Sequence, residues 1–145
     1  MKLGLLLWLA SLFPHETADR ICLASTIYLE ARSESLLGQA AVAEVALRRR
    51  ESGQWGSTLC SVLTARGQFA LSTTNTNYIV DESPAWQSAW TVAGAAMRIW
   101  SLPPQMRVSL VPKADHFLAV SATTPAWAKG QPLAVIGDHK FYREN

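Results

Sequence analysis

The sequence contains few of the residues that build metal centres and none of the short motifs that bind nucleotides. Three histidines and two cysteines occur in 145 residues, and no HExxH or paired CxxC motif gives them zinc-ligand spacing. No glycine-rich loop is arranged to hold phosphate groups. The formal net charge of +2 indicates no basic surface of the kind that binds nucleic acid. We therefore predict no metal, no other cofactor and no nucleic-acid partner.

What is present is a chain of ordinary globular composition. Hydrophobic residues make up 49% of it, charged residues 17%, and no repeat or low-complexity tract interrupts it, so we predict one folded domain over residues 19–145. Six tryptophans are many for this length. They are typical either of a sugar-binding cleft or of a core, and both readings stay open.

The N-terminal segment has the pattern of an export signal. Lys2 precedes an apolar run from Leu3 to Phe13, and Pro14 ends it. A run of about 11 residues is too short to span a bilayer comfortably but matches the hydrophobic part of a signal. We expect residues 1–18 to direct export to the periplasm or cell envelope, either cleaved or retained as a weak membrane anchor. The alternative is a short first helix that packs on the domain.

The two cysteines, Cys22 and Cys60, allow two interpretations. They form a disulfide if the compartment is oxidising. Both also lie in apolar helical contexts, where small buried thiols are common.

Periodicity and cap residues predict a helical first part followed by short strands. The expected helices cover residues 18–31, 36–51, 57–65 and 84–100. Thr17 is expected to cap the first, and Ser33 or Ser35 the second. Residues 71–83 are polar and predict a surface loop, and the expected extended runs are 106–111, 116–120 and 132–137. The fold class is therefore α+β, with a helical lobe and a small irregular β region forming a cleft.

Glu30 stands out because its position in the first helix conflicts with its charge. It follows Leu23 by seven residues and Ile27 by three, which places all three on one stripe. Removing a carboxylate from water raises its pKa, and a raised pKa suits a general acid near neutral pH. Glycosidic bond cleavage uses such a proton donor. Spacing alone also fits a structural carboxylate that pairs with Arg32 or Arg49.

Several strings in the chain occur in a recognisable order. The first is TIYLEARSESLLGQAAVAEVALRRR, which begins at Thr26; the others are LCSV followed by GQF, then ADHF, PAWA and IGDHKFY. Together they resemble the signature of the SleB-type cell wall hydrolases, the spore-cortex-lytic enzymes and related phage endolysins. The resemblance covers residues 19–143. Its first string is similar to the family's T-I-Y-G-E-A-R-G-E and G-Q elements.

This resemblance implies a lysozyme-like or lytic-transglycosylase-like fold and an enzyme that cleaves peptidoglycan. It places the family's catalytic glutamate on Glu30 and implies cleavage between N-acetylmuramic acid and N-acetylglucosamine. The glutamate protonates the glycosidic oxygen and then accepts the proton of the muramyl C6 hydroxyl, which attacks C1 and leaves a 1,6-anhydro end. One carboxylate suffices, because the sugar hydroxyl replaces the water or nucleophile that a second carboxylate would activate or supply.

The resemblance also suggests residues that contact the glycan from the helical side and from the loops. We expect Tyr28 and Gln68 to orient the substrate through hydrogen bonds. Phe69 and Trp127 are expected to stack on sugar rings, with a role in the core as the equal alternative for each.

On the β side of the cleft we expect His116, His139 and Tyr142 to hold or line the wall, again with a core role as the alternative for Tyr142. Glu34 is expected to pair with Arg32 or to cap the next helix instead of acting on substrate.

The chain departs from the family pattern near these positions. Leu29 and Ser33 replace glycines, Arg48 replaces an asparagine, Phe117 replaces a tyrosine and Ala70 follows GQF in place of a serine. These changes concern substrate contacts more than the class of reaction.

Three functions remain open from the sequence. The first is a lytic transglycosylase, which we favour, and the second is a hydrolytic muramidase that uses Asp81, Glu82 or Asp115 as a second carboxylate. The third is a non-catalytic peptidoglycan-binding protein. In each case we expect a monomer that binds peptidoglycan strands, with weak membrane association through residues 1–18. The sequence does not choose between a phage lysis protein and a secreted bacterial enzyme.

Overall fold

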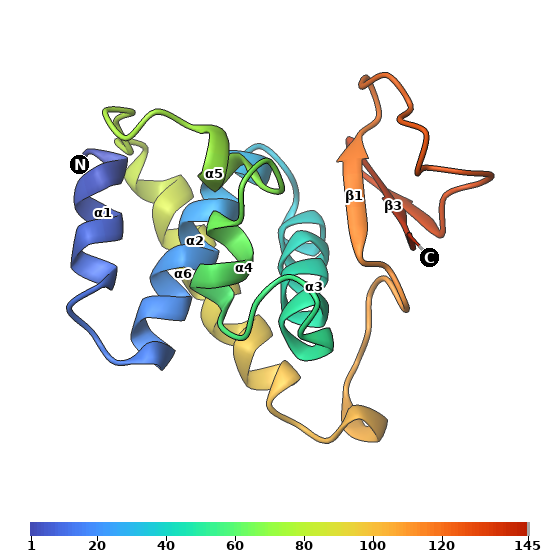
Figure 1. Cartoon of the computed structure of the whole chain (residues 1–145), viewed down its shortest axis with the longest axis horizontal. Coiled ribbons are helices and arrows are strands. Elements are labelled where there is room, and N and C mark those ends of the chain that lie inside the picture. The colour runs from blue at the N-terminus through green and yellow to red at the C-terminus, as the bar shows by residue number, and fades with distance from the viewer. Residues whose placement is uncertain (145) are drawn as a thin grey trace.

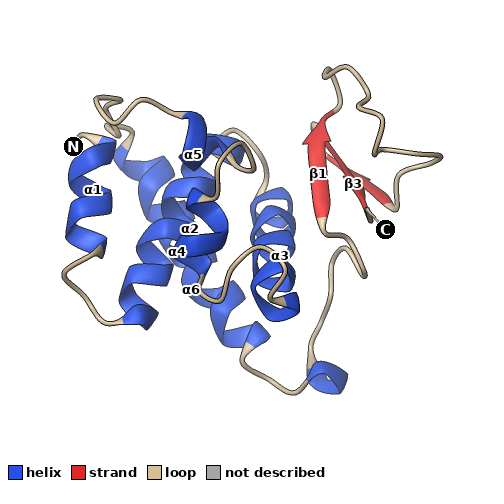
Figure 2. Cartoon of the chain, viewed as in Figure 1, coloured by secondary structure: helices blue, strands red, loops and turns tan. Residues whose placement is uncertain are grey.

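The computed structural model describes residues 1–144 and divides them into a helical lobe and a small sheet (Figures 1 and 2). The helices are α1 (Leu3–Ala10), α2 (His15–Ala31), α3 (Leu36–Ser52), α4 (Leu59–Thr64), α5 (Ala70–Thr73) and α6 (Ser83–Trp100). A 3-10 turn (Pro104–Met106) leads to β1 (His116–Ala119), β2 (Ala134–Ile136) and β3 (His139–Tyr142). The predicted α+β class is confirmed.

Helix α2 is the centre of the helical lobe. It contacts all the other helices, α1 and α3 to α6, and its Leu23, Ala24 and Ile27 side chains are fully buried. A disulfide between Cys22 and Cys60 joins α2 to α4, with the two Cα atoms 5.3 Å apart. The disulfide interpretation of the two cysteines therefore holds in this structure.

The ends of the helices follow local chemistry, with one exception. Ser35 caps α3 by accepting a hydrogen bond from the Gly38 N–H at 3.2 Å, as predicted. Gly53 ends α3 in the left-handed conformation, with φ of 74°, which glycine adopts without steric cost. The predicted cap at Thr17 is wrong, because α2 begins at His15 directly after Pro14 and Thr17 lies inside its first turn.

Two parts of the expected pattern are wrong in the second half of the chain. Helix α5 forms at the start of the predicted loop 71–83. The predicted extended run 106–111 forms no strand: Met106 ends the 3-10 turn and residues 110–111 bend. The Leu110 and Val111 N–H groups donate to the Glu44 carboxylate at 2.8 and 2.9 Å. A buried glutamate of α3 thus replaces a neighbouring strand as the partner of this backbone.

The sheet has the order β1-β3-β2 with both pairings antiparallel. The runs at 116–120 and 132–137 supply β1 and β2, as predicted. The central strand β3 was not predicted, since its four residues, His139 to Tyr142, follow a turn and show no long alternating pattern. In Figure 1 the sheet lies beside α3, on the side away from α1.

The N-terminal segment forms α1 and packs on the domain. Leu3 is fully buried, and its N–H donates to the Tyr78 carbonyl at 2.8 Å. Met1 and Val80 exchange backbone hydrogen bonds of 2.8 and 2.9 Å. Residues 3–10 thus form a helix that packs on the domain, whereas the role of residues 1–18 in export stays a prediction. Within residues 1–144 no helix is both long and apolar enough to cross a membrane.

Candidate active site

Glu30 is the penultimate residue of α2, at the rim of the buried stripe that the spacing predicts. Leu23 and Ile27 are fully buried on that stripe, whereas Glu30 remains partly exposed. Burial raises the pKa of the Glu30 carboxyl above its ordinary value, and a hydrogen bond from the Ala70 N–H lowers it by a smaller amount. A carboxyl in this setting keeps its proton to higher pH, as a general acid requires.

Neither predicted arginine neutralises Glu30. Arg32 pairs with Glu82 at 3.2 Å and also lies over the Tyr28 ring. Arg49 donates to the Asp115 carbonyl at 2.7 Å. Within residues 1–144 no cation lies within 4.0 Å of the Glu30 carboxylate, so the structural ion-pair interpretation of Glu30 does not fit this structure.

The Ala70 N–H is available to Glu30 because of where α5 begins. Phe69 is the N-cap residue and Ala70 the first residue of α5, and N–H groups in the first turn of a helix have no partner within it. The replacement of the family's serine by Ala70 therefore leaves the backbone donor in place.

Gln68 is exposed, and its side chain is held by Arg49. Its Oε1 atom accepts a hydrogen bond from Arg49 Nη1 at 3.2 Å, which leaves the amide NH₂ group to serve as a donor. The Arg49 side chain is buried against Trp55 and Phe69. Burial lowers the pKa of the Arg49 guanidinium to about 10, and the negative charges of Asp115 and Glu144 raise it by a smaller amount. Arg49 is therefore still a cation at neutral pH. This geometry fits the predicted role of Gln68 as a donor.

Tyr28 and Phe69 lie in the core and present no surface to a sugar. Tyr28 is 0% exposed, and its hydroxyl accepts the Glu82 N–H at 3.2 Å. Phe69 is 3% exposed and packs 5.9 Å from the Phe117 ring. The predicted direct contacts do not fit this burial, and the core alternative for Phe69 does.

An open groove of about 800 Å³ borders the end of α2. Its walls come from residues 32, 34–36 and 39 on one side and from residues 81–85 and 88 on the other. Glu34, Asp81 and Glu82 give it an acidic lining, with Arg32 as its one cation among the lining residues. Glu30 lies two residues before this wall and is not itself part of the lining.

Glu34 connects the groove to the sheet, which neither prediction for it anticipated. Its Oε1 atom accepts the Asp138 N–H at 2.7 Å and lies 3.1 Å from His139 Nδ1. Arg32 pairs elsewhere and Ser35 caps α3, so both predictions for Glu34 are wrong. His139 thereby lies on the sheet face that meets the helical lobe.

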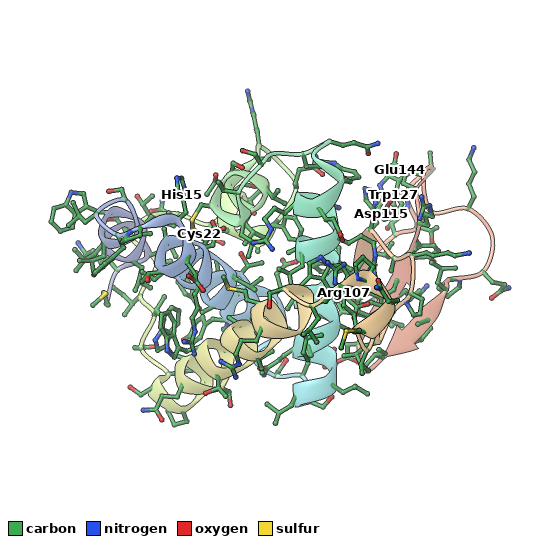
Figure 3. All side chains as sticks on the ribbon, turned by 90° about the horizontal axis from the view of Figure 1, so that it is seen from below. His15, Cys22, Arg107, Asp115, Trp127 and Glu144 are labelled. Atoms are coloured by element: carbon green, nitrogen blue, oxygen red, sulfur yellow. A yellow bond between two sulfur atoms is a disulfide. The ribbon has the colours of Figure 1, made fainter. Side chains whose placement is uncertain are left out.

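The remaining β-side candidates form a separate cluster. His116 lies between Asp115 and Glu144, with its two ring nitrogens 2.8 Å from a carboxylate oxygen of each. Trp127 is partly exposed, with its ring 4.7 Å from His116 and 5.8 Å from Tyr142. Asp115, Trp127 and Glu144 gather on the sheet side in Figure 3. None of these residues lines the groove beside α2, and among residues 1–144 no group of three or more His, Cys, Asp or Glu side chains is arranged so that it could hold a metal ion.

A partly buried carboxyl with a raised pKa, at the end of the central helix, is the kind of group that general acid catalysis of glycan cleavage uses. The chain belongs to the cell wall hydrolase family, which matches residues 33–142. The protein is therefore an enzyme that degrades peptidoglycan, and the non-catalytic alternative is set aside. Glu30 precedes the matched range by three residues, so its role depends on the geometry described above.

The fold is similar to that of one solved structure in particular. This is the catalytic domain of the germination-specific lytic transglycosylase SleB from Bacillus anthracis, with a TM-score of 0.64 and 23% identity over 86% of this chain and 93% of that chain. At this identity the likeness shows a shared fold. No curated protein sequence matches the chain significantly.

Sequence reasoning missed three groups around Glu30. The Ala70 N–H carries no side-chain signal. The sequence suggests Arg49 as a partner of Glu30, and Glu34 as a partner of Arg32 or a cap of the next helix, and neither pattern points to the contacts seen. The contacts of Glu34 and Arg49 join residues that are 19 to 105 positions apart, which no local pattern reveals.

Proposed function

We propose that this enzyme is a lytic transglycosylase in which Glu30 acts first as acid and then as base. Protonated Glu30 gives its proton to the glycosidic oxygen between N-acetylmuramic acid and N-acetylglucosamine as the C1–O bond breaks. The resulting carboxylate accepts the proton of the muramyl C6 hydroxyl as that oxygen bonds to C1. The products are a 1,6-anhydromuramyl end and a free 4-hydroxyl on N-acetylglucosamine.

The observation that supports this proposal most strongly is the setting of Glu30. It is partly buried, its pKa is raised, it has one backbone donor and it has no cation partner within the described residues. Because a neighbouring cation would hold the carboxyl deprotonated, such a setting favours proton donation. The solved structure with the similar fold is described as a lytic transglycosylase, which agrees with a one-carboxylate mechanism.

The proposal predicts anhydro ends in the digest. Purified peptidoglycan treated with the enzyme should release muropeptides that carry 1,6-anhydromuramic acid and resist borohydride reduction. Mass spectrometry separates these from hydrolysis products, which are heavier by one water and reducible. A digest that contains only reducible muramyl ends would replace the transglycosylase by a muramidase on the same scaffold.

The muramidase alternative has two structural candidates for its second carboxylate. Asp81 and Glu82 line the groove, although Glu82 is engaged by Arg32. Asp115 is a poor candidate, because it is buried and accepts the Glu144 N–H at 2.8 Å while contacting His116. Of the three, Asp81 is the one whose replacement by asparagine should abolish reducing-end formation if hydrolysis occurs.

We further propose that the enzyme acts outside the cytoplasm as a monomer and touches the membrane surface weakly through its N-terminal segment. Peptidoglycan lies outside the cytoplasm, and a disulfide is typical of an oxidising compartment. The outer face of the segment exposes Leu5, Trp8, Leu12 and Phe13 at 44 to 61%. Apolar and aromatic side chains of this kind insert into the interfacial region of a bilayer.

Replacing Trp8, Leu12 and Phe13 by serine should weaken binding to vesicles. We expect the partition coefficient between water and vesicles to fall about tenfold or more, because the loss of three interfacial side chains costs at least ~1.4 kcal/mol of binding free energy. Co-sedimentation with vesicles of phosphatidylglycerol and phosphatidylethanolamine measures it. The matched control replaces three exposed apolar residues that lie elsewhere, namely Ile99, Leu102 and Met106. Equal binding by wild type and both variants would contradict the membrane contact.

A further inference from the structure

We propose that Glu34 is a positioning residue for Glu30, because it fastens the turn before β3 to the helical lobe and so fixes the sheet relative to the end of α2. This inference rests on the proposed function of Glu30. It assigns to the second glutamate of the EARSE string a role that acts through the sheet and not through contact with the reacting atoms.

The attachment of Glu34 is specific and largely buried. Its Oε1 atom accepts the Asp138 N–H at 2.7 Å and contacts His139 Nδ1 at 3.1 Å. The Glu34 and His139 side chains are each only 9% exposed. Since a carboxylate can only accept hydrogen bonds, the His139 Nδ1 atom is the donor in this contact. Two donors thus converge on one oxygen from a segment more than 100 residues away.

The turn itself is shaped to receive Glu34. Gly137 has φ of 55°, and a Cβ atom built on it would lie 2.8 Å from Glu34 Oε1. Only glycine allows both this backbone conformation and so close an approach. The carboxylate therefore sits against bare backbone, which leaves it little freedom to move.

The Glu34 contact closes a ring of contacts that begins and ends at the end of α2. From Glu30 the ring passes through the Ala70 N–H to Phe69, whose ring lies 5.9 Å from Phe117 in β1. The Phe117 ring lies 5.2 Å from His139 in β3, and His139 contacts Glu34. Glu34 follows Glu30 by four residues, so cutting this one link removes the direct attachment of the sheet to the end of α2, while Arg49 and the buried Phe141 still hold the sheet to the rest of the lobe.

Two substitutions of Glu34 test the proposal on peptidoglycan. Glu34→Ala removes both hydrogen bonds, and we expect kcat to fall about 10- to 100-fold with KM little changed, the size of effect that a misplacement near 1 Å produces. Glu34→Gln keeps an acceptor oxygen at the same place and should retain kcat within about threefold of wild type, because the geometry survives. In both variants the alkaline limb of the pH profile should stay where it is, since that limb reports Glu30.

The matched control is Glu44→Ala. Glu44 is also a buried glutamate that accepts backbone N–H groups from a distant segment, but it lies outside the ring of contacts. It should lower thermal stability at least as much as Glu34→Ala while leaving kcat of the folded enzyme unchanged, with assays run well below both unfolding transitions. Wild-type kcat in Glu34→Ala would overturn the proposal. A folded Glu34→Gln as inactive as Glu34→Ala would also overturn it, because the charge would then act on the substrate directly.

The link can be tested separately from the reaction. A thermal-unfolding cycle of Glu34→Ala, His139→Ala and the double variant should show non-additive losses, as expected for side chains in direct contact. Additive losses would overturn the link even in an active enzyme. If wild type fails to cleave peptidoglycan while the cycle shows coupling, the role proposed for Glu30 fails and the attachment of the sheet stands.

Discussion

Glu30→Gln is expected to lower the rate of peptidoglycan cleavage about 10²- to 10⁴-fold, the usual contribution of a positioned proton donor. Glutamine has nearly the same shape and can still accept the Ala70 N–H, but it has no proton to give to the leaving oxygen. The measurement is release of soluble muropeptides from purified sacculi. Binding to sacculi, measured by sedimentation, should persist in the variant.

The pH dependence of the wild type follows from the raised pKa of Glu30. The acid form is active, so activity should fall as pH rises through this raised value, giving an alkaline limb above the ordinary range of a glutamate. In Glu30→Gln the residual rate should show no such limb. A limb that persists in the variant would assign it to another group.

Stability provides the internal control for this substitution. Because burial raises the pKa of Glu30 in the folded state, its contribution to stability is fully present below the unfolded pKa and is lost as pH rises through the folded pKa. Glu30→Gln should therefore unfold at the same or a higher temperature than wild type near neutral pH. The exposed Glu16 in the first turn of α2 is the matched control, and Glu16→Gln should leave both rate and limb unchanged. A Glu30→Gln variant with full activity would remove the basis of the proposed mechanism.

Loss of the Cys22–Cys60 disulfide is expected to be the largest single effect on stability. The bridge joins residues that are 38 positions apart, and closing a loop of that length stabilises the fold by about 4 kcal/mol in the chain-entropy description. The double variant Cys22→Ala/Cys60→Ala, or reduction of the wild type, should shift the denaturant midpoint downward accordingly. Equilibrium unfolding with and without reductant measures this free energy.

The double variant also controls for the reductant. Its unfolding curve should not respond to dithiothreitol, whereas that of the wild type should. Coincident oxidised and reduced curves for the wild type would show that the bridge contributes nothing to stability. We expect activity to decline only when unfolding begins.

The helical lobe was largely predictable because its signals are local. Ser35 and Gly53 mark the two ends of α3, Pro84 lies in the first turn of α6, and the stripe through Leu23 and Ile27 places Glu30 at the edge of the core. Each of these depends on neighbours within about one turn of helix, which a sequence pattern reports directly.

The predictions that the structure overturns concern residues whose partners are distant in sequence. Residues 106–111 have the composition of a strand, but the Leu110 and Val111 N–H groups donate to the Glu44 carboxylate instead of to a neighbouring strand. Strand β3 is short, and only its two flanking partners make it a strand. At the site, Glu30 can be identified from the sequence because it is a charged residue on an apolar helix stripe. The role of Glu34 can be inferred only from the structure, which places the turn at Gly137 against its carboxylate.

The order of strands in the sheet has a consequence for biosynthesis. Strand β3 follows β1 and β2 in the chain but lies between them in the sheet, so neither of these has its hydrogen-bonding neighbour until residues 139–142 have been made. The turn that holds Glu34 belongs to the same late segment. The sheet therefore cannot close, and Glu34 cannot bind its turn, until this segment of the nascent chain has emerged and reached the helical lobe.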